Sequence, residues 1–247
     1  MGERARRKRL FLAKHPFCCF CGGGKPATTE DHVPPRSLFA QRRWPEGYAF
    51  PACEKCNAAT RLAEQVFTFL SRCSQDPLNR QGEAEFNRAV DALGNNHPGI
   101  LLEILPSRSL TYRGRPAIQV NGPQVRRAVE DYARKLFSAL HYKETGRILP
   151  QSGGIAWQWW SNVQLFEGEM PTTFETRFHG TPALKRQKEV LEDQFKYKYT
   201  VTEDGLYGMY LAAFRQSFAI AGIVAFDYAF LTKGAPPDAV ILRPLPP

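Results

Sequence analysis

The chain has 247 residues, 43% hydrophobic and 23% charged, which is enough to bury one large core or two modest ones in an ordinary globular composition. Its best candidate for a membrane span, residues 217–226, is much shorter than the roughly 20 residues that a membrane helix requires, and the apolar stretch at residues 10–13 is too short for a secretory signal. We therefore expect a cytoplasmic protein with no membrane segment. In that reducing compartment, 6 cysteines indicate metal binding rather than disulfides.

The net charge of +9 is unevenly distributed along the chain. Residues 1–65 carry 12 Lys and Arg against 6 Asp and Glu, a net +6, whereas the remaining 21 against 18 give +3. A basic segment of this kind favours a polyanionic partner, because each phosphate contact by Lys or Arg releases condensed counterions. For the run from Arg4 to Arg9 alone, a solvated basic tail is the alternative.

The first third of the chain predicts a helix, a hairpin and a second helix. Residues 3–15 have helical periodicity with most arginines on one side. Residues 16–56 are rich in Gly, Pro and Cys and predict loops with a short hairpin. Residues 56–73 place apolar side chains at helical spacing, with Asn57 at the start of that helix.

The pattern changes beyond about residue 75, and residues 73–79 are the expected domain boundary. Amphipathic helices are predicted at 81–93 and 123–142, and strands at 114–120, 155–166 and 217–226. Residues 195–214 alternate aromatic and polar side chains across Asp204 and Gly205, which is typical of a hairpin. We expect an α+β fold, with a zinc-stapled module in residues 1–75 and an α+β domain with an antiparallel sheet in residues 76–247. The second domain could bind DNA or form a dimer.

Two Cys-x-x-Cys pairs predict a tetrahedral zinc site. The pairs are Cys18 with Cys21 and Cys53 with Cys56. Four thiolates leave zinc no open position, so the ion is structural rather than catalytic. Cys19 is the alternative partner in the first pair, but a Cys-x-Cys spacing fits the zinc turn less well. Cys73 lies outside the pattern and is expected to be a small buried apolar residue.

The segment between the two pairs contains Asp31 and His32, followed by two prolines one residue later, and Asn57 comes directly after Cys56. This pattern of Cys-x-x-Cys, Asp-His-x-x-Pro and Cys-x-x-Cys-Asn covers residues 16 to about 70. It resembles the zinc-stapled HNH, or ββα-metal, endonuclease family, and most closely its endonuclease VII-like subgroup. It is also similar to stand-alone bacterial and phage HNH endonucleases.

The resemblance implies a treble-clef or ββα-metal fold for the N-terminal module. It also implies that His32 is the general base, that Asp31 and Asn57 hold a catalytic Mg²⁺ or Mn²⁺, and that the cysteine pairs hold the structural Zn²⁺. General chemistry is consistent with these roles, because histidine has a pKa suited to deprotonating water and oxygen ligands suit hard divalent ions. Glu64, further along the helix, could reach the metal or be an ordinary exposed carboxylate.

One residue of the family pattern is missing. The family has a middle Asn that braces the loop carrying the base, and neither Asn nor His occurs between His32 and Cys56. Tyr48 stands near that position, so either its hydroxyl or the backbone is expected to brace the loop. A weakened site is the other interpretation.

The predicted function is a metal-dependent endonuclease that hydrolyses phosphodiester bonds in nucleic acid, with DNA as the expected form. The alternative is a catalytically inactive, zinc-stapled module that only binds nucleic acid. Trp44 and Tyr48 could stack on bases or be buried, and the protein could form a homodimer. Five basic side chains near the motif are candidates for phosphate contacts: Arg36, Arg42, Arg43, Lys55 and Arg61.

Overall fold

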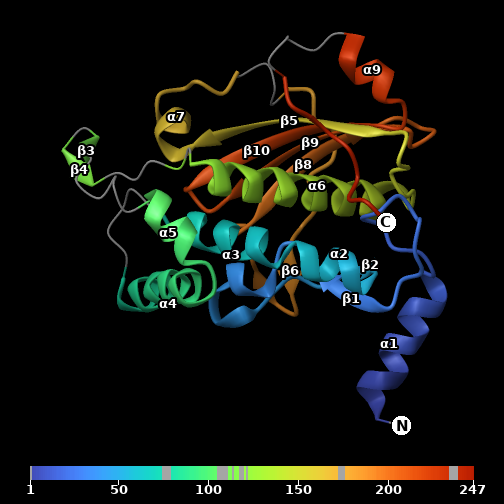
Figure 1. Ribbon diagram of the computed structural model, residues 1–247, viewed down its shortest axis with the longest axis horizontal. Coiled ribbons are helices and arrows are strands. Elements are labelled where there is room, and N and C mark those ends of the chain that lie inside the picture. The colour runs from blue at the N-terminus through green and yellow to red at the C-terminus, as the bar shows by residue number, and fades with distance from the viewer. Residues whose placement is uncertain are drawn as a thin grey trace.

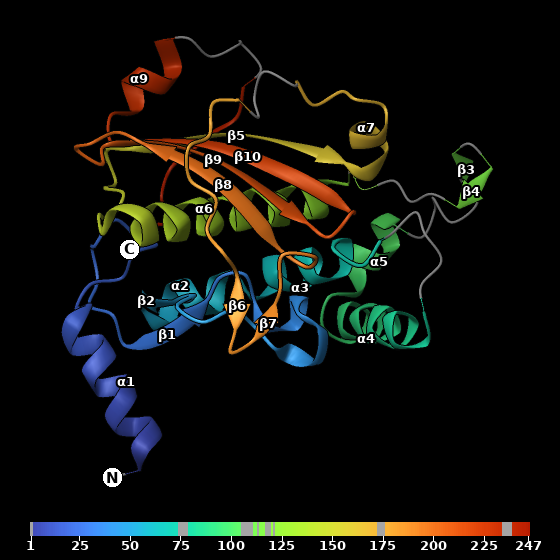
Figure 2. The same ribbon diagram turned by 180° about the vertical axis from the view of Figure 1, so that it is seen from behind.

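The structure is a computed structural model of residues 1–247 (Figure 1). It describes residues 2–73, 79–104, 111–112, 114–116, 120, 122–171, 176–233 and 239–247. An antiparallel sheet forms one layer, the long helix α6 (Pro123–Thr145) crosses one face of that sheet, and the N-terminal elements pack against the other side of α6 (Figures 1 and 2). The expected α+β class with antiparallel sheets is confirmed.

The N-terminal part contains a projecting helix, a hairpin and two consecutive helices. Its elements are α1 (Glu3–Lys14), β1 (Thr29–His32), the 3-10 turns η1 (Arg36–Leu38) and η2 (Ala40–Arg42), β2 (Ala49–Ala52), α2 (Glu54–Ala59) and α3 (Arg61–Leu70). In the hairpin, Asp31 of β1 lies opposite Phe50 of β2, and His32 lies opposite Ala49. The helix predicted at 3–15 and the short hairpin are confirmed.

The single helix predicted over residues 56–73 is wrong, because the chain breaks at Thr60 into α2 and α3. The Thr60 hydroxyl donates to the Cys56 carbonyl oxygen over 3.2 Å. The first helix also begins earlier than predicted, because the Cys53 side chain caps its N-terminus. A helix cap that is itself a predicted zinc ligand ties the direction of α2 to the cysteine cluster.

The rest of the chain forms a helical pair, helix α6 and a five-stranded sheet. The helices are α4 (Arg80–Asn96), α5 (Pro98–Ile104), α7 (Asn162–Phe166) and α9 (Tyr228–Lys233). The sheet has the order β11-β5-β10-β9-β8, with β5 (Gly154–Ser161), β8 (Lys196–Val201), β9 (Tyr207–Phe214), β10 (Phe218–Ala225) and β11 (Ile241–Leu242). Two small ladders are β3 (Thr111–Tyr112) with β4 (Arg115–Pro116) and β6 (Lys185–Arg186) with β7 (Glu189–Val190).

Most predicted elements of this part are confirmed: the helices at 81–93 and 123–142, the hairpin at 195–214 and the strand at 217–226. The strand predicted at 155–166 is only half right, because it ends at Ser161 and helix α7 follows. The Ser161 hydroxyl accepts the backbone N–H of Gln164 at 3.3 Å, and the Gln164 side chain accepts the N–H of Ser161 at 3.0 Å. This capping box favours a helix start over strand continuation.

Two predictions fall on residues outside the described ranges. Residues 74–78, at the expected domain boundary, are not among the described residues, and the strand predicted at 114–120 is described only at residues 114–116 and 120. The hydrophobic core nevertheless extends across that position in the chain. One cluster of buried side chains includes residues from both sides of it, and the rings of Phe67 on α3 and Tyr132 on α6 stack at 3.8 Å between centroids.

Helix α6 is the central element of this core. Gly222 of β10 lets it approach the sheet, because a Cβ there would lie 2.6 Å from the Phe137 ring. His141 of α6 is fully buried, with Nδ1 at 2.9 Å from the Tyr210 hydroxyl and Nε2 donating to the Gly205 carbonyl at 3.0 Å. Burial lowers the pKa of His141 to about 4. Within the described ranges, no helix combines the length and apolarity needed to cross a membrane.

Candidate metal centre and catalytic hairpin

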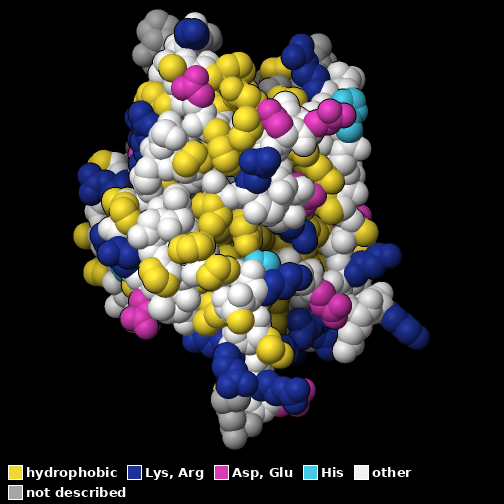
Figure 3. Space-filling model, turned by 90° about the vertical axis from the view of Figure 1, so that its right-hand side faces the viewer, with side chains coloured by type: hydrophobic (Ala, Val, Ile, Leu, Met, Phe, Trp, Pro, Cys, Tyr) yellow, Lys and Arg dark blue, Asp and Glu magenta, His cyan; other side chains and the backbone are white. Residues whose placement is uncertain are grey.

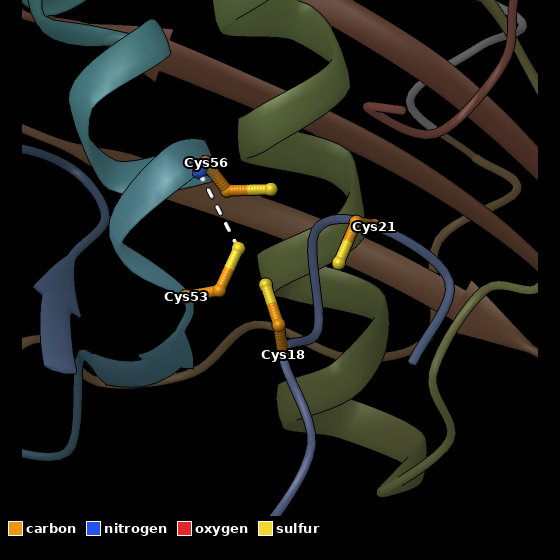
Figure 4. A group of neighbouring side chains, drawn as sticks. All are labelled: Cys18, Cys21, Cys53 and Cys56. Atoms are coloured by element: carbon orange, nitrogen blue, oxygen red, sulfur yellow. Dashed lines mark hydrogen bonds between the residues drawn. The ribbon is translucent and has the colours of Figure 1, made fainter. Parts of the chain in front are cut away.

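The four predicted zinc ligands meet in one cluster, shown in Figure 4, where Cys18 and Cys21 come from a loop and Cys53 and Cys56 from the start of α2. All four are buried, and their sulfur atoms lie within 4.8 Å of one another. Tetrahedral zinc with Zn–S distances of about 2.3 Å places its sulfurs about 3.8 Å apart. The cluster therefore matches a zinc site after a modest contraction, and these side chains could hold such an ion.

Local backbone features shape the loop and helix start that carry the cysteines. Gly22 and Gly23 have φ angles of +63° and +75°, which residues other than glycine rarely adopt. The Gly23 N–H donates to the Cys18 carbonyl at 3.2 Å, closing the first turn. In the second pair, the Cys56 N–H points at the Cys53 sulfur over 3.4 Å. An N–H directed at sulfur stabilises negative charge there, as a zinc thiolate needs.

The electrostatics of the cluster also favour a cation. A hydrogen bond from Cys56 is the main cause that lowers the pKa of Cys18 to about 5, so one sulfur is stable as a thiolate. Burial and then the charge on Cys18 raise the pKa of Cys21 to about 12. A second negative charge is thus unfavourable unless a bound dication compensates it.

The two remaining cysteines lie outside the cluster. Cys19 is buried, but its sulfur is not part of the group, in agreement with the choice of Cys21 as ligand. Cys73 is only partly buried and directs its thiol at the Phe69 carbonyl over 3.5 Å. It packs against the core, as expected for a small apolar residue, but it is less buried than predicted.

The carboxylate of Asp31 lies against a buried ammonium group from the second part of the chain. Its Oδ1 accepts the backbone N–H of His32 at 2.8 Å, and its Oδ2 is 2.6 Å from Nζ of Lys135 on α6. The same Nζ pairs with the Glu64 carboxylate and donates to the Thr60 hydroxyl at 3.0 Å. The side-chain exposures of Lys135, Asp31 and Glu64 are 0%, 7% and 22%. Asp31 is therefore already in contact with a cation.

Both carboxylates stabilise the charge of Lys135, whereas the charge of Asp31 disfavours that of Glu64. Burial alone would lower the pKa of Lys135, but the carboxylates of Asp31 and Glu64 outweigh it and the pKa is raised. Burial raises the pKa of Glu64 even though Lys135 opposes that shift. The contact with Lys135 and a side-chain exposure of 22% make Glu64 an ion-pair partner and not an ordinary exposed helix carboxylate.

His32 is a neutral imidazole engaged by a neighbouring arginine. Its Nε2 is 2.8 Å from a terminal nitrogen of Arg36. Since a guanidinium only donates hydrogen bonds, Nε2 is the acceptor and Nδ1 carries the proton. Burial, followed by the charges of Arg36 and Lys135, lowers the pKa of His32 to about 4. The ring therefore has the protonation state of a general base, although its basic nitrogen is occupied by Arg36.

Asn57 and Tyr48 hold the hairpin in place by different contacts. The Asn57 amide donates to the Thr29 hydroxyl at 3.4 Å, which links α2 to the strand that carries Asp31. The Tyr48 carbonyl accepts the N–H of Val33 at 3.3 Å, whereas the Tyr48 hydroxyl donates to that of Tyr197 at 3.1 Å. Of the two expected braces, the backbone is the one that holds the residue after His32.

The predicted phosphate-binding residues have different environments. Arg42 and Arg61 are exposed, Arg43 forms an ion pair with Glu189 at 3.2 Å, and Lys55 donates to the Pro247 carbonyl at 2.6 Å. Arg36 contacts His32, as described above. In Figure 3, Lys and Arg side chains gather on the lower part of the displayed face, around the projecting helix α1. No residue of α1 is buried.

Two residues of this region were missed by the sequence reasoning: Lys135 and Arg186. Lys135 carried a signal, because it follows Ala128 and Tyr132 at seven- and three-residue spacing on α6 and so falls on the buried stripe of that helix. A lysine on such a stripe requires a buried partner. Arg186, in a two-residue strand, had no local signal.

Comparison with known family models, curated proteins and solved structures found no match for this chain. The resemblance to HNH endonucleases therefore rests on the spacing of the motif residues.

Proposed function

We propose that the chain is a metal-dependent endonuclease that hydrolyses phosphodiester bonds in nucleic acid, DNA being the expected substrate, with His32 as the general base. The observation that carries this proposal is the cysteine cluster next to the β1–β2 hairpin. The cluster anchors α2, the helix of Asn57, and Asn57 is tied to the strand that ends in Asp31 and His32.

In this proposal His32 accepts the proton of the water that attacks phosphorus. The ring is neutral at physiological pH, as a proton acceptor must be, but a pKa of about 4 makes it a weaker base than a free imidazole. The bond from Arg36 has to move away first, since it occupies the lone pair on Nε2. General-base catalysis of this kind typically supplies a rate factor of about 10² to 10⁴.

Asp31 and Asn57 are the proposed ligands of the catalytic Mg²⁺ or Mn²⁺. Carboxylate and amide oxygens suit these ions, and a bound ion has to compete with the Lys135 ammonium for the Asp31 carboxylate. A bound ion would neutralise charge that develops on the phosphate oxygens. Asp31 would then be shared between the ion and Lys135.

The alternative is a binding module without catalytic activity. A specific observation favours it: Lys135 already neutralises Asp31, and Arg36 already occupies the basic nitrogen of His32. The basic N-terminal part and the cysteine cluster would serve nucleic-acid binding equally well.

A plasmid-nicking assay in Mg²⁺, Mn²⁺ or EDTA decides between these functions. We expect cleavage by the wild-type protein with a divalent ion, and a fall of about 10²- to 10⁴-fold for His32→Ala with unchanged zinc content and DNA affinity. His179→Ala is the matched control, because the His179 side chain is exposed. Undiminished cleavage by His32→Ala would remove this residue from the mechanism. Binding without cleavage, under every metal and nucleic-acid form tried, would support the binding module.

A further inference from the structure

Two arginines that are far apart in the sequence meet on the ring of Trp44, beside His32. The guanidinium carbon of Arg36 lies 3.7 Å from the centroid of the Trp44 ring, and that of Arg186 lies 4.2 Å from it. Arg186 also donates to the Trp44 carbonyl at 3.2 Å. The ring of His32 meets Trp44 edge-on, with centroids 5.2 Å apart. The guanidinium groups of Arg36 and Arg186 are therefore both stacked on the indole ring, next to the proposed base.

The β6–β7 ladder that carries Arg186 is fixed to the loop between β1 and β2. The N–H of Glu46 donates to the Lys185 carbonyl at 3.0 Å, and the Glu46 carboxylate accepts the N–H of Gln187 at 3.3 Å. Arg43 of the loop pairs with Glu189 of β7. Figure 2 shows the ladder reaching down from the sheet to this part of the molecule. Arg186 is thus held beside Trp44 by contacts on both sides.

The guanidinium groups of Arg36 and Arg186 form no ion pair with a carboxylate in the part of the chain that the structure describes. Besides burial, the charges of Arg4, Arg42 and Arg186 lower the pKa of Arg36, and only Glu30 opposes them. Nε of Arg36 is buried and has no hydrogen-bond partner. A buried N–H without a partner, in a group of guanidiniums that repel one another, favours a bound anion.

We propose that Arg36 and Arg186 together bind one phosphate group of a nucleic-acid backbone next to His32. The planar guanidinium group matches a phosphate with paired hydrogen bonds, and stacking on Trp44 limits its orientations. When Arg36 turns to the phosphate, its N–H leaves Nε2 of His32, and the base becomes available at the place where the phosphate is held. This inference rests on the proposed function and adds a residue of the second part of the chain to its site.

The test is DNA binding measured by fluorescence anisotropy with a labelled short duplex, in EDTA and over a series of salt concentrations. We expect Arg186→Gln to bind about tenfold more weakly and the slope of log K against log salt to become shallower by about 0.9, the value for one lost phosphate contact. Arg186→Lys keeps the charge and should keep the slope. Arg88→Gln is the matched control, because Arg88 on α4 is exposed and donates to the Ala84 carbonyl of its own helix.

Each outcome decides a different question. An unchanged salt slope in Arg186→Gln, with zinc content and circular dichroism like those of the wild type, overturns the inference. The nuclease proposal stands in that case if the wild type still nicks plasmid. If Arg186→Gln fails to fold, Arg36→Gln must show the same loss of slope, and an unchanged slope there overturns the inference as well. A wild-type protein that binds no duplex, branched or single-stranded nucleic acid overturns both proposals.

Discussion

Replacing Lys135 by Met tests how the two parts of the chain depend on each other. The change removes the ammonium that contacts Asp31 at 2.6 Å and also pairs with Glu64. Met keeps most of the aliphatic stem, so packing in the interior of α6 changes little. The two carboxylates then face a buried space without their cation.

The expected cost follows from burial. Removing one partner of a buried ion pair typically destabilises a protein by about 3–5 kcal/mol, because the other charge stays buried and unpaired. Asp31 meets this condition with 7% of its side chain exposed, whereas Glu64 with 22% can turn partly toward water. We therefore expect a loss near the lower end, about 3 kcal/mol in the free energy of unfolding.

The measurement is urea unfolding of the zinc-loaded protein at neutral pH, with the free energy obtained by linear extrapolation. Arg127→Met, an exposed position on the same helix, is the matched control and should change the free energy by less than about 0.5 kcal/mol. Adding Asp31→Asn and Glu64→Gln to Lys135→Met should restore most of the loss, because no unpaired charge remains. A loss below about 1 kcal/mol in Lys135→Met, or no recovery in the triple variant, would refute the reasoning.

Three further predictions concern the metals and acid stability. Purified protein should contain about one zinc per chain by elemental analysis, and Cys19→Ser should retain this zinc. Cys56→Ser should lose the zinc and unfold the N-terminal part. A Cys56→Ser protein that is soluble, zinc-free and active would contradict the structural role of the zinc. Mn²⁺ should raise the melting temperature of Lys135→Met more than that of the wild type if Asp31 is a divalent-ion ligand, and equal shifts would argue against that role. Because the pKa of His141 falls from 6.5 to about 4 on folding, the unfolded state binds the extra proton between these values and stability is lost as the pH falls. Between pH 7.5 and 5.5 the wild type should lose about 1.3 kcal/mol more than His141→Gln in urea unfolding, and parallel losses would show that His141 is not responsible.

The cysteine cluster and the hairpin were predictable because their signals are local. A Cys-x-x-Cys spacing makes one turn around a metal, and Gly22 and Gly23 after the first pair supply the left-handed backbone that this turn needs. Two pairs with a hairpin between them leave few arrangements in which all four sulfurs meet.

The errors in the elements came from side chains that compete with secondary structure. Apolar spacing continues through residues 56–73, but the Thr60 hydroxyl and the Cys53 cap divide that stretch into two helices. In the same way, aromatic content predicts a strand through residue 166, but the capping box of Ser161 and Gln164 starts a helix. Periodicity records which face is buried and does not record such local hydrogen bonds.

Lys135 and Arg186 could not be assigned to the site from sequence, because their partners are remote in the chain. Lys135 reaches Asp31 only after α6 has packed between the sheet and α3, and Arg186 reaches Trp44 only after the β6–β7 ladder has docked on the loop. The pattern of α6 indicates that Lys135 is buried, but it does not identify Asp31 as the partner, and no local pattern places Arg186 beside Trp44.

The contacts of β1 indicate how the proposed site is divided. Successive side chains of a strand point to opposite faces, so Asp31 contacts Lys135 on α6 while His32 contacts Arg36 and the Trp44 ring. Positive groups therefore lie on both faces of this short strand. The ammonium of Lys135 lies beside the Asp31 carboxylate, and the guanidinium groups of Arg36 and Arg186 lie near the His32 imidazole. A phosphate held by the arginines would meet the base directly, whereas an ion held by Asp31 would act from the other face. In the proposed endonuclease, the dependence of the cleavage rate on a divalent ion would therefore measure how much of the phosphate charge is neutralised by the metal and not by the arginines.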